Sequence, residues 1–320
     1  MALPGDPAAL VRFALGGDRR ALARIITVVE DGRPDAGEIL AAACGGSPNA
    51  FRVGITGAPG AGKSTITDAL IAVLRASGDE VGVLAVDPSS PFSGGAVLGD
   101  RVRMQDHALD PGVYIRSMAS RGHLGGLAAA APKVLALLEA AGFPWLLVET
   151  VGVGQDEVEV VEAADTTVVV VTPGWGDGIQ VAKAGILEIG DVFVVNKADR
   201  HGVRETVADL KAMLHLGGNR EWVPPVVETI ATTGEGIDRV AAAIADHRSH
   251  LESTGLLEEG RRRRRIGELE SALAHGYRRL AEESVAAASG ADVVAAVAAG
   301  SIDPWSAADR ILAAGLPAAR

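Results

Sequence analysis

The feature that most constrains this chain is a glycine-rich loop that lies between a short apolar run and an amphipathic segment. Residues 57–64 have the sequence GAPGAGKS, which follows the β-branched stretch 52–56 and precedes the helix-length stretch 64–75. A loop of this form wraps a diphosphate with its backbone N–H groups, and the helix that follows adds the partial positive charge of its N-terminus. The stretch therefore predicts a phosphate-binding loop at the end of a strand.

Strand-length apolar runs alternate with helix-length segments after residue 51. The predicted strands are 52–56, 81–86, 113–117, 145–149, 166–171, 192–196 and 226–229, and the helices between them are 64–75, 125–140, 179–188 and 203–214. Continuous apolar strands of this kind predict an α/β fold with a mostly parallel sheet covered on both faces.

Helical periodicity without strands marks both ends of the chain. The predicted helices are 6–29, broken at Gly16-Gly17, then 38–44, and after the last strand 239–251, 262–288 and 304–314. We therefore predict an N-terminal helical segment at 1–50, a P-loop domain at 51–246 and a C-terminal helical arm at 247–320.

Charge and cysteine content exclude some classes of protein. The formal net charge of −11 argues against a broad nucleic-acid surface, and the basic run Arg261–Arg265, close to Glu258 and Glu259, is typical of an ion-paired helix face. The single cysteine, Cys44, cannot form an intramolecular disulfide and fits a reducing compartment. With no signal-peptide pattern and no apolar run of spanning length, we expect a cytoplasmic protein with no membrane or nucleic-acid partner.

Charged and hydroxyl side chains around the loop indicate the phosphate chemistry. Lys63 supplies a full positive charge to the β- and γ-phosphates, and the Ser64 hydroxyl is a ligand for Mg²⁺. Magnesium needs further oxygen ligands. Glu149 ends the predicted strand 145–149, Asp87 directly follows the predicted strand 81–86, and Asp100 lies further along the same connection. Each carboxylate singly also fits a helix cap or a solvated turn, but together with the loop they favour a magnesium site.

The base is indicated by a short motif after the sixth predicted strand. Asn196, Lys197 and Asp199 form N-K-x-D, in which the carboxylate accepts from guanine N1–H and N2–H₂, a pair that adenine lacks. After the seventh predicted strand, Ala231-Thr232 offers backbone N–H groups to guanine O6. We therefore expect GTP and GDP as ligands rather than ATP.

The segment ETVG, residues 149–152, occupies the place of the D-x-x-G of many GTPases. Gly152 would donate its N–H to the γ-phosphate and so respond to its loss. Many such enzymes place a water-orienting glutamine directly after this glycine, whereas here Val153 stands there. We therefore predict hydrolysis of GTP to GDP and phosphate with a slow intrinsic rate.

With these residues in hand, the chain resembles the MeaB/ArgK family of P-loop GTPases, which belong to the SIMIBI class. The stretches that carry the resemblance are GITGAPGAGKST, VLAVDPSSPFSGGAVLGDRVRM, RGHLGGLA, ETVGVGQDEVEV, PGWGDGIQVAKAGILEIGD, NKAD and TGEGI. The resemblance implies a GTPase chaperone that docks on adenosylcobalamin-dependent methylmalonyl-CoA mutase or a relative, gates cobalamin loading and protects the mutase. It also implies a homodimer formed through the C-terminal helical arm.

The family's site residues carry over by position. Those of the phosphate loop are Gly57, Ala58, Pro59, Gly60, Ala61, Gly62, Lys63, Ser64 and Thr65. Those around Mg²⁺ are Ser64, Asp87, Asp100 and Glu149, and those that read the base are Asn196, Lys197 and Asp199. A segment at 176–183 corresponds to the part that responds to the mutase, and it would bring Gln180 or Lys183 to the phosphates. Lys183 also fits an ordinary solvated helix lysine. Where the family commonly has Ser-Ala, this chain has Ile230-Ala231, which loses a hydroxyl contact.

Two other functions remain open on the residues. One is a kinase that acts on an amino-acid transport binding protein, although the chain has no H-R-D-like element to supply a base. The other is a metal-insertion GTPase, which is disfavoured because that class usually has dense His or Cys clusters and the sequence shows none, and which metal binding would test.

Overall fold

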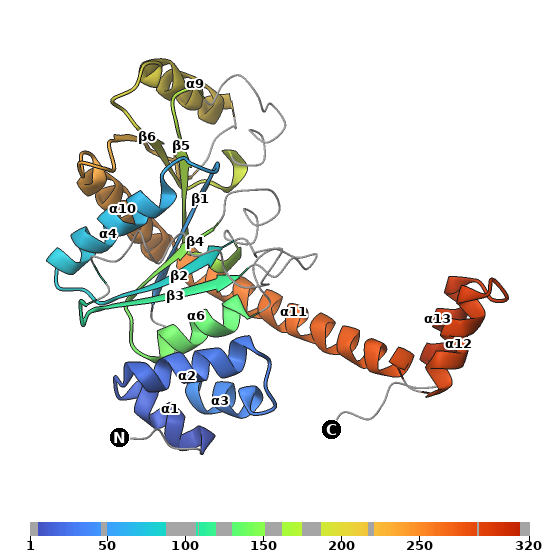
Figure 1. The fold of residues 1–320 in the computed structure, drawn as a ribbon. Helices are drawn as coiled ribbons and strands as arrows, with labels where there is room; N and C mark the ends of the chain where they lie inside the picture. The colour runs from blue at the N-terminus through green and yellow to red at the C-terminus, as the bar shows by residue number, and fades with distance from the viewer. Residues whose placement is uncertain are drawn as a thin grey trace. The chain divides into compact units, whose positions relative to one another are not determined.

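The computed structural model describes residues 6–45, 50–87, 107, 109–119, 130–150, 162–174, 187–216, 221–286 and 288–313. The chain divides into two units, one within residues 1–260 and one within residues 261–320 (Figure 1). The boundaries predicted at residues 50 and 246 stay predictions.

A seven-stranded sheet forms the centre of the first unit. Its strands are β1 (Phe51–Gly57), β2 (Val81–Asp87), β3 (Val113–Ala119), β4 (Trp145–Glu149), β5 (Thr166–Val171), β6 (Val192–Asn196) and β7 (Val226–Thr229). They lie in the order β3-β2-β4-β1-β5-β6-β7, and every pairing is parallel. The predicted α/β class with a parallel sheet is confirmed, and each strand begins and ends within two residues of its expected bounds.

Helices cover both faces of the sheet, as Figure 1 shows. α4 (Lys63–Ala76) and α10 (Ile237–Thr254) share one hydrophobic cluster with β1, β5 and β6, to which Val168 and Val170 contribute. α9 (Val203–Leu216) packs with Val169 and Val171 on the opposite face. This alternation follows from the two-residue period of strands, and with both faces covered all four valines are buried.

The N-terminal helices extend the layer on the second face. α1 (Pro7–Leu15), α2 (Arg19–Glu30) and α3 (Ala36–Ala43) share a core with α6 (Ala131–Ala140) and with side chains of β2, β3 and β4. The predicted break at Gly16-Gly17 is present, since Gly17 has φ +93° and the Asp18 carboxylate caps α2 by accepting from the N–H groups of Arg20 and Ala21.

The second unit contains helices only within its described part. α11 (Leu256–Ala286) begins at the end of the first unit and continues into the second. α12 (Ala288–Ala298) and α13 (Pro304–Ala313) follow it. α12 was not expected, because its sequence ASGADVVAAVA has little apolar periodicity and forms a helix on alanine propensity. Of the predicted helices, 125–140 lies partly and 179–188 mostly outside the described residues. No described helix is both long and apolar enough to cross a bilayer.

Candidate nucleotide-binding site

The phosphate loop follows β1, whose carboxyl end lies at a switch point of the sheet. β1 pairs with β4 on one side and β5 on the other, while the next strand in the chain, β2, lies beyond β4. The connection from β1 to β2 and the connection from β4 to β5 therefore run in opposite directions across the sheet. Such a point opens the crevice where α/β proteins bind ligands.

Two glycines of the loop are required by their surroundings. Gly57 has φ +132°, and a Cβ there would lie 2.0 Å from the Val170 carbonyl oxygen of β5. Gly62 has φ +99°, and a Cβ there would lie 2.3 Å from Nδ2 of Asn196. Both positions combine a left-handed backbone with a close neighbour, so that only glycine fits without a shift.

Lys63 begins α4 and turns its side chain back into the loop. Its residue is 7% exposed, and its ammonium donates to the carbonyl oxygens of Gly57 at 2.8 Å and Ala58 at 3.2 Å. The charge is thus held inside the turn that the sequence assigns to the phosphates. Pro59 and Gly60 lie exposed at the tip of the loop, and Thr65 lies half-buried in the first turn of α4.

Ser64 and Glu149 are brought together from residues that are far apart in the chain. The Ser64 hydroxyl donates to Oε1 of Glu149 at 2.5 Å, and both residues are buried. The pairing of Ile55 with Glu149 in the sheet accounts for this, because it places the end of β4 beside the start of the loop. A hydroxyl and a carboxylate oxygen in contact are a donor set that suits Mg²⁺.

The other expected metal ligands are placed only in part. Asp87 ends β2 two residues beyond Ala85, which pairs with Glu149, so its backbone lies at the same edge. Its side chain lies outside the described part of the structure. Asp100, Gly152, Gln180 and Lys183 lie outside the described residues altogether.

Asn196, at the end of β6, connects the phosphate loop to residues 196–199 (the base-reading turn), which the sequence predicts to read the base. Its Nδ2 donates to the Ala61 carbonyl at 2.8 Å, and its Oδ1 accepts from the Thr229 hydroxyl and from Ala231 N–H, each at 3.1 Å. Every bond is buried, so that one amide fixes the spacing between three loops. Thr229 was missed by the sequence reasoning, and its position as the last residue of β7 was the available signal.

The rest of the base-reading turn lies around this amide. Lys197 has φ +60°, unusual for a residue with a side chain, and its ammonium donates to the Gly60 carbonyl at 2.6 Å. Asp199 and Thr232 are exposed. Because Ala231 N–H already donates to Asn196, a guanine O6 would share that N–H or take the one of Thr232.

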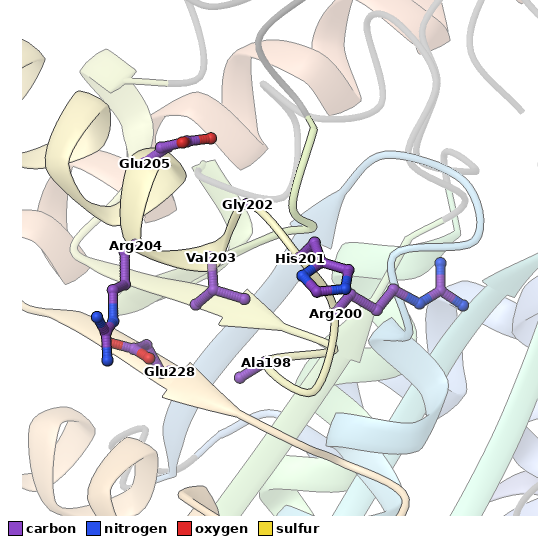
Figure 2. A pocket seen from close by; sticks show the side chains of 8 residues that line it. All are labelled: Ala198, Arg200, His201, Gly202, Val203, Arg204, Glu205 and Glu228. Atoms are coloured by element: carbon purple, nitrogen blue, oxygen red, sulfur yellow. The ribbon is translucent and has the colours of Figure 1, made fainter.

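A cavity lies beside the base-reading turn, with a volume of about 470 Å³. Figure 2 shows its lining, which comes from the start of α9, the preceding turn and β7. The lining residues are Ala198, Arg200, His201, Gly202, Val203, Arg204, Glu205 and Glu228. Ala198, which lines the cavity, lies between Lys197 and Asp199 in the chain. The cavity therefore adjoins the turn that would read the base.

Two histidines of α10 have a spacing that places metal ligands on one helix face. His247 and His250 have the one H-x-x-H spacing of the chain, and their rings lie 6.4 Å apart. His247 Nδ1 is 2.8 Å from the Thr166 hydroxyl, a contact inside the protein. Within the described ranges, no group of three His, Cys, Asp or Glu side chains could hold a metal ion.

Comparisons with known proteins agree with this geometry. The family described as "Methylmalonyl Co-A mutase-associated GTPase MeaB" matches residues 22–286. A putative GTPase of Pyrococcus abyssi (strain GE5 / Orsay) is 49% identical over 300 residues, which cover 92% of this chain and 93% of that relative. GTPase ArgK of Escherichia coli (strain K12) is 38% identical over 266 residues, which cover 80% of each chain.

A solved structure is similar over nearly the whole length. It is described as a LAO/AO transport system kinase, with a TM-score of 0.70, 28% identity, and coverage of 97% of this chain and 98% of that chain. The predicted resemblance is therefore confirmed by the family match, by relatives and by fold. The family description and both relatives name a GTPase, and the chain belongs to the MeaB family of methylmalonyl-CoA mutase-associated GTPases.

Proposed function

We propose that this GTPase is a switch that docks on an adenosylcobalamin-dependent acyl-CoA mutase, methylmalonyl-CoA mutase or a relative, and that it gates cofactor loading and protects the mutase. The family description names a mutase association, which supports the partner. The observation that carries the nucleotide site of this switch is the bond from Asn196 to Ala61, because it joins the base-reading turn to the phosphate loop and so holds both as one site.

The proposed binding mode assigns each polar group a role. Backbone N–H groups of residues 57–65 surround the phosphates, and Lys63 exchanges its bonds to Gly57 and Ala58 for bonds to β- and γ-phosphate oxygens. Asp199 accepts from guanine N1–H and N2–H₂. The Lys197 stem lies along the ring, and Ala231 or Thr232 donates to O6.

Mg²⁺ is proposed at the contact between Ser64 and Glu149. These residues would hold it together with Asp87 and Asp100, directly or through water, and Gly152 would respond to the γ-phosphate. When bound, Mg²⁺ would offset the negative charge that develops on the β- and γ-phosphate oxygens. Glu149 also orients the Ser64 hydroxyl, to which it is bonded.

We propose a slow intrinsic rate of hydrolysis. Water attacks the γ-phosphorus, the bond to the β–γ bridging oxygen breaks, and GDP keeps the electron pair. Val153 cannot orient the attacking water as a glutamine would. The mutase-responsive segment would supply Gln180 or Lys183, and the partner would thereby raise the rate.

A homodimer through the C-terminal helices is part of the proposal. On α11, four exposed apolar side chains recur at intervals of three and four residues and so share one helix face. They are Ile266 at 51%, Leu269 at 59%, Leu273 at 52% and Tyr277 at 59% exposed. A second copy of this helix would cover such a stripe.

The single cysteine supports a cytoplasmic, reducing location as part of the proposal.

The test is GTP hydrolysis with and without purified methylmalonyl-CoA mutase from the same source. We expect the mutase to raise the rate by about tenfold or more. The increase should vanish in Lys63→Ala, and Asp199→Asn should shift preference from GTP to xanthosine triphosphate. If the mutase does not change the turnover of GTP, the GTPase activity stands but the assignment of the mutase as partner is wrong.

A kinase is the second candidate, favoured by the description of the similar solved structure. Terminally labelled GTP distinguishes the two functions. Release of the label as free phosphate supports the switch, whereas label that stays on an amino-acid transport binding protein supports the kinase.

A further inference from the structure

β7 is an edge strand, and the carbonyl of Glu228 is among its groups that face away from the sheet. The carbonyls of Pro225 and Thr229 accept from N–H groups of Phe193 and Ala198, on the side of β6. In a parallel pair, alternate residues direct their polar groups to the same neighbour. The carbonyl of Glu228 therefore points outward, on the side where no strand of the described residues pairs with β7.

The outward polar groups at this end of β7 are bonded by the chain that follows it. Ile230 N–H donates to the Glu235 carbonyl at 3.0 Å, and Thr233 N–H donates to the Ile230 carbonyl at 3.0 Å. The next outward group back along the strand is the Glu228 carbonyl, which accepts from Nη2 of Arg239 at 2.9 Å. The Arg239 side chain thus takes the place that a further strand residue would occupy.

Gly236 makes room for this contact. It has φ +82°, and a Cβ there would lie 2.3 Å from the Glu228 carbonyl oxygen and 3.1 Å from Nη2 of Arg239. The loop 230–236 is consequently held at its first residues by β7, and at its end by the start of α10 and the guanidinium that reaches back from it.

We propose that Arg239 is a positioning residue for guanine recognition. By holding Glu228 from α10, it fixes the loop that presents the N–H groups of Ala231 and Thr232 to guanine O6. The inference rests on the proposed binding mode, in which one of these groups contacts O6. Arg239 itself touches no nucleotide.

The same strand end also reaches the other base-reading segment. Ala198 N–H donates to the Thr229 carbonyl at 3.0 Å, and Glu228 lines the same cavity as Ala198 (Figure 2). Loss of the Arg239 bond should act mainly on the loop 230–236, because the Asp199 turn keeps its own bond to Thr229.

The experiment compares dissociation constants for three nucleotides in Arg239→Ala. GDP has every base contact, inosine diphosphate keeps O6 but lacks the N2 amine, and 6-thioguanosine diphosphate replaces O6 with a poor acceptor. We expect GDP and inosine diphosphate to bind about fivefold more weakly, the loss of about one hydrogen bond, and 6-thioguanosine diphosphate to change less than about twofold. Arg239→Lys, which keeps a donor, should recover part of the loss.

Arg248→Ala is the matched control. This second arginine of α10 lies over the rings of Phe51 and Trp145 at 5.1 and 5.4 Å, at the far end of the helix. It should lower stability to urea and leave the nucleotide ratios unchanged.

Two outcomes would overturn the inference. If Arg239→Ala weakens all three nucleotides equally, or none, the residue does not position the O6 contact. If the unmodified protein binds GDP and 6-thioguanosine diphosphate equally well, the O6 contact in the proposed binding mode is itself wrong, and the inference falls with it.

Discussion

Gly62 is constrained both by its own backbone conformation and by the Asn196 side chain that lies against it. In Gly62→Ala the left-handed backbone costs about 1–2 kcal/mol of stability. The new Cβ also displaces the Asn196 amide. We expect Gly62→Ala to weaken GDP binding by about tenfold or more, because the bond from Asn196 to Ala61 is lost. Equilibrium binding of a fluorescent GDP analogue measures this.

Gly78→Ala separates the two costs. Gly78 has φ +88°, but a Cβ there meets no atom within 4 Å, so the variant carries the backbone strain alone. It should be destabilised by about 1 kcal/mol and bind GDP normally. Equal nucleotide affinity in the two variants would show that Asn196 does not couple the two loops.

Glu149 offers a second test at the scale of one residue. Glu149→Gln keeps an oxygen acceptor for the Ser64 hydroxyl and removes the charge that a divalent cation needs. The Mg²⁺ concentration that half-saturates nucleotide binding should rise by about tenfold, with binding at saturating Mg²⁺ largely retained. A titration of GDP affinity against Mg²⁺ measures it, and an unchanged midpoint would exclude Glu149 from the metal site.

At the scale of the element, α10 is attached to the sheet through a buried histidine. His247 is 4% exposed, lies between Thr166 and the Trp222 ring, and has Nε2 at 3.6 Å from Oδ1 of Asp191. Burial, together with the nearby His250, lowers the pKa of His247 to about 4, and Asp165 opposes the shift. The imidazole is therefore neutral in the folded protein near neutral pH.

This pKa predicts how stability depends on pH. Between pH 6.5 and about 4 the unfolded chain binds a proton at His247 that the folded chain does not, so stability falls as pH falls through this window. The loss is at most roughly 3 kcal/mol. The free energy of unfolding in urea is measured for the native protein and for His247→Gln at pH 7, 6, 5 and 4. The difference in this free energy between the two proteins should shrink toward acid pH. Parallel curves would contradict the assignment, and exposed His201→Gln serves as the control.

At the scale of the whole molecule, the apolar stripe on α11 predicts the oligomeric state. Leu269→Glu with Leu273→Glu places two charges in the proposed dimer contact and should yield a monomer. Ser271→Glu, on the opposite side of the helix, should remain dimeric. Sedimentation velocity measures the mass of each, and GDP affinity should be equal in all of them. A native protein that sediments as a monomer would refute the dimer.

Much of the fold was predictable because its determinants are local. Runs rich in valine, isoleucine and leucine and buried on both faces mark the inner strands β1, β2, β4, β5 and β6, and glycines define where α1 ends and where the phosphate loop turns. α12 escaped prediction because alanine-rich sequence carries propensity without a periodic pattern. The strand order was not predictable, since nothing near β4 in the chain specifies that it lies between β1 and β2.

The amino-acid sequence by itself determined the fold class, the family, the phosphate loop and the residue types that favour guanine, because each is encoded in contiguous motifs. Only the tertiary structure decided which of those residues meet. Ser64 reaches Glu149, Asn196 reaches Ala61, and Arg239 reaches the outward carbonyl of Glu228. The first two depend on strand order and register and the third on how α10 packs beside β7, and these are properties of distant segments packed together rather than of any one stretch of chain.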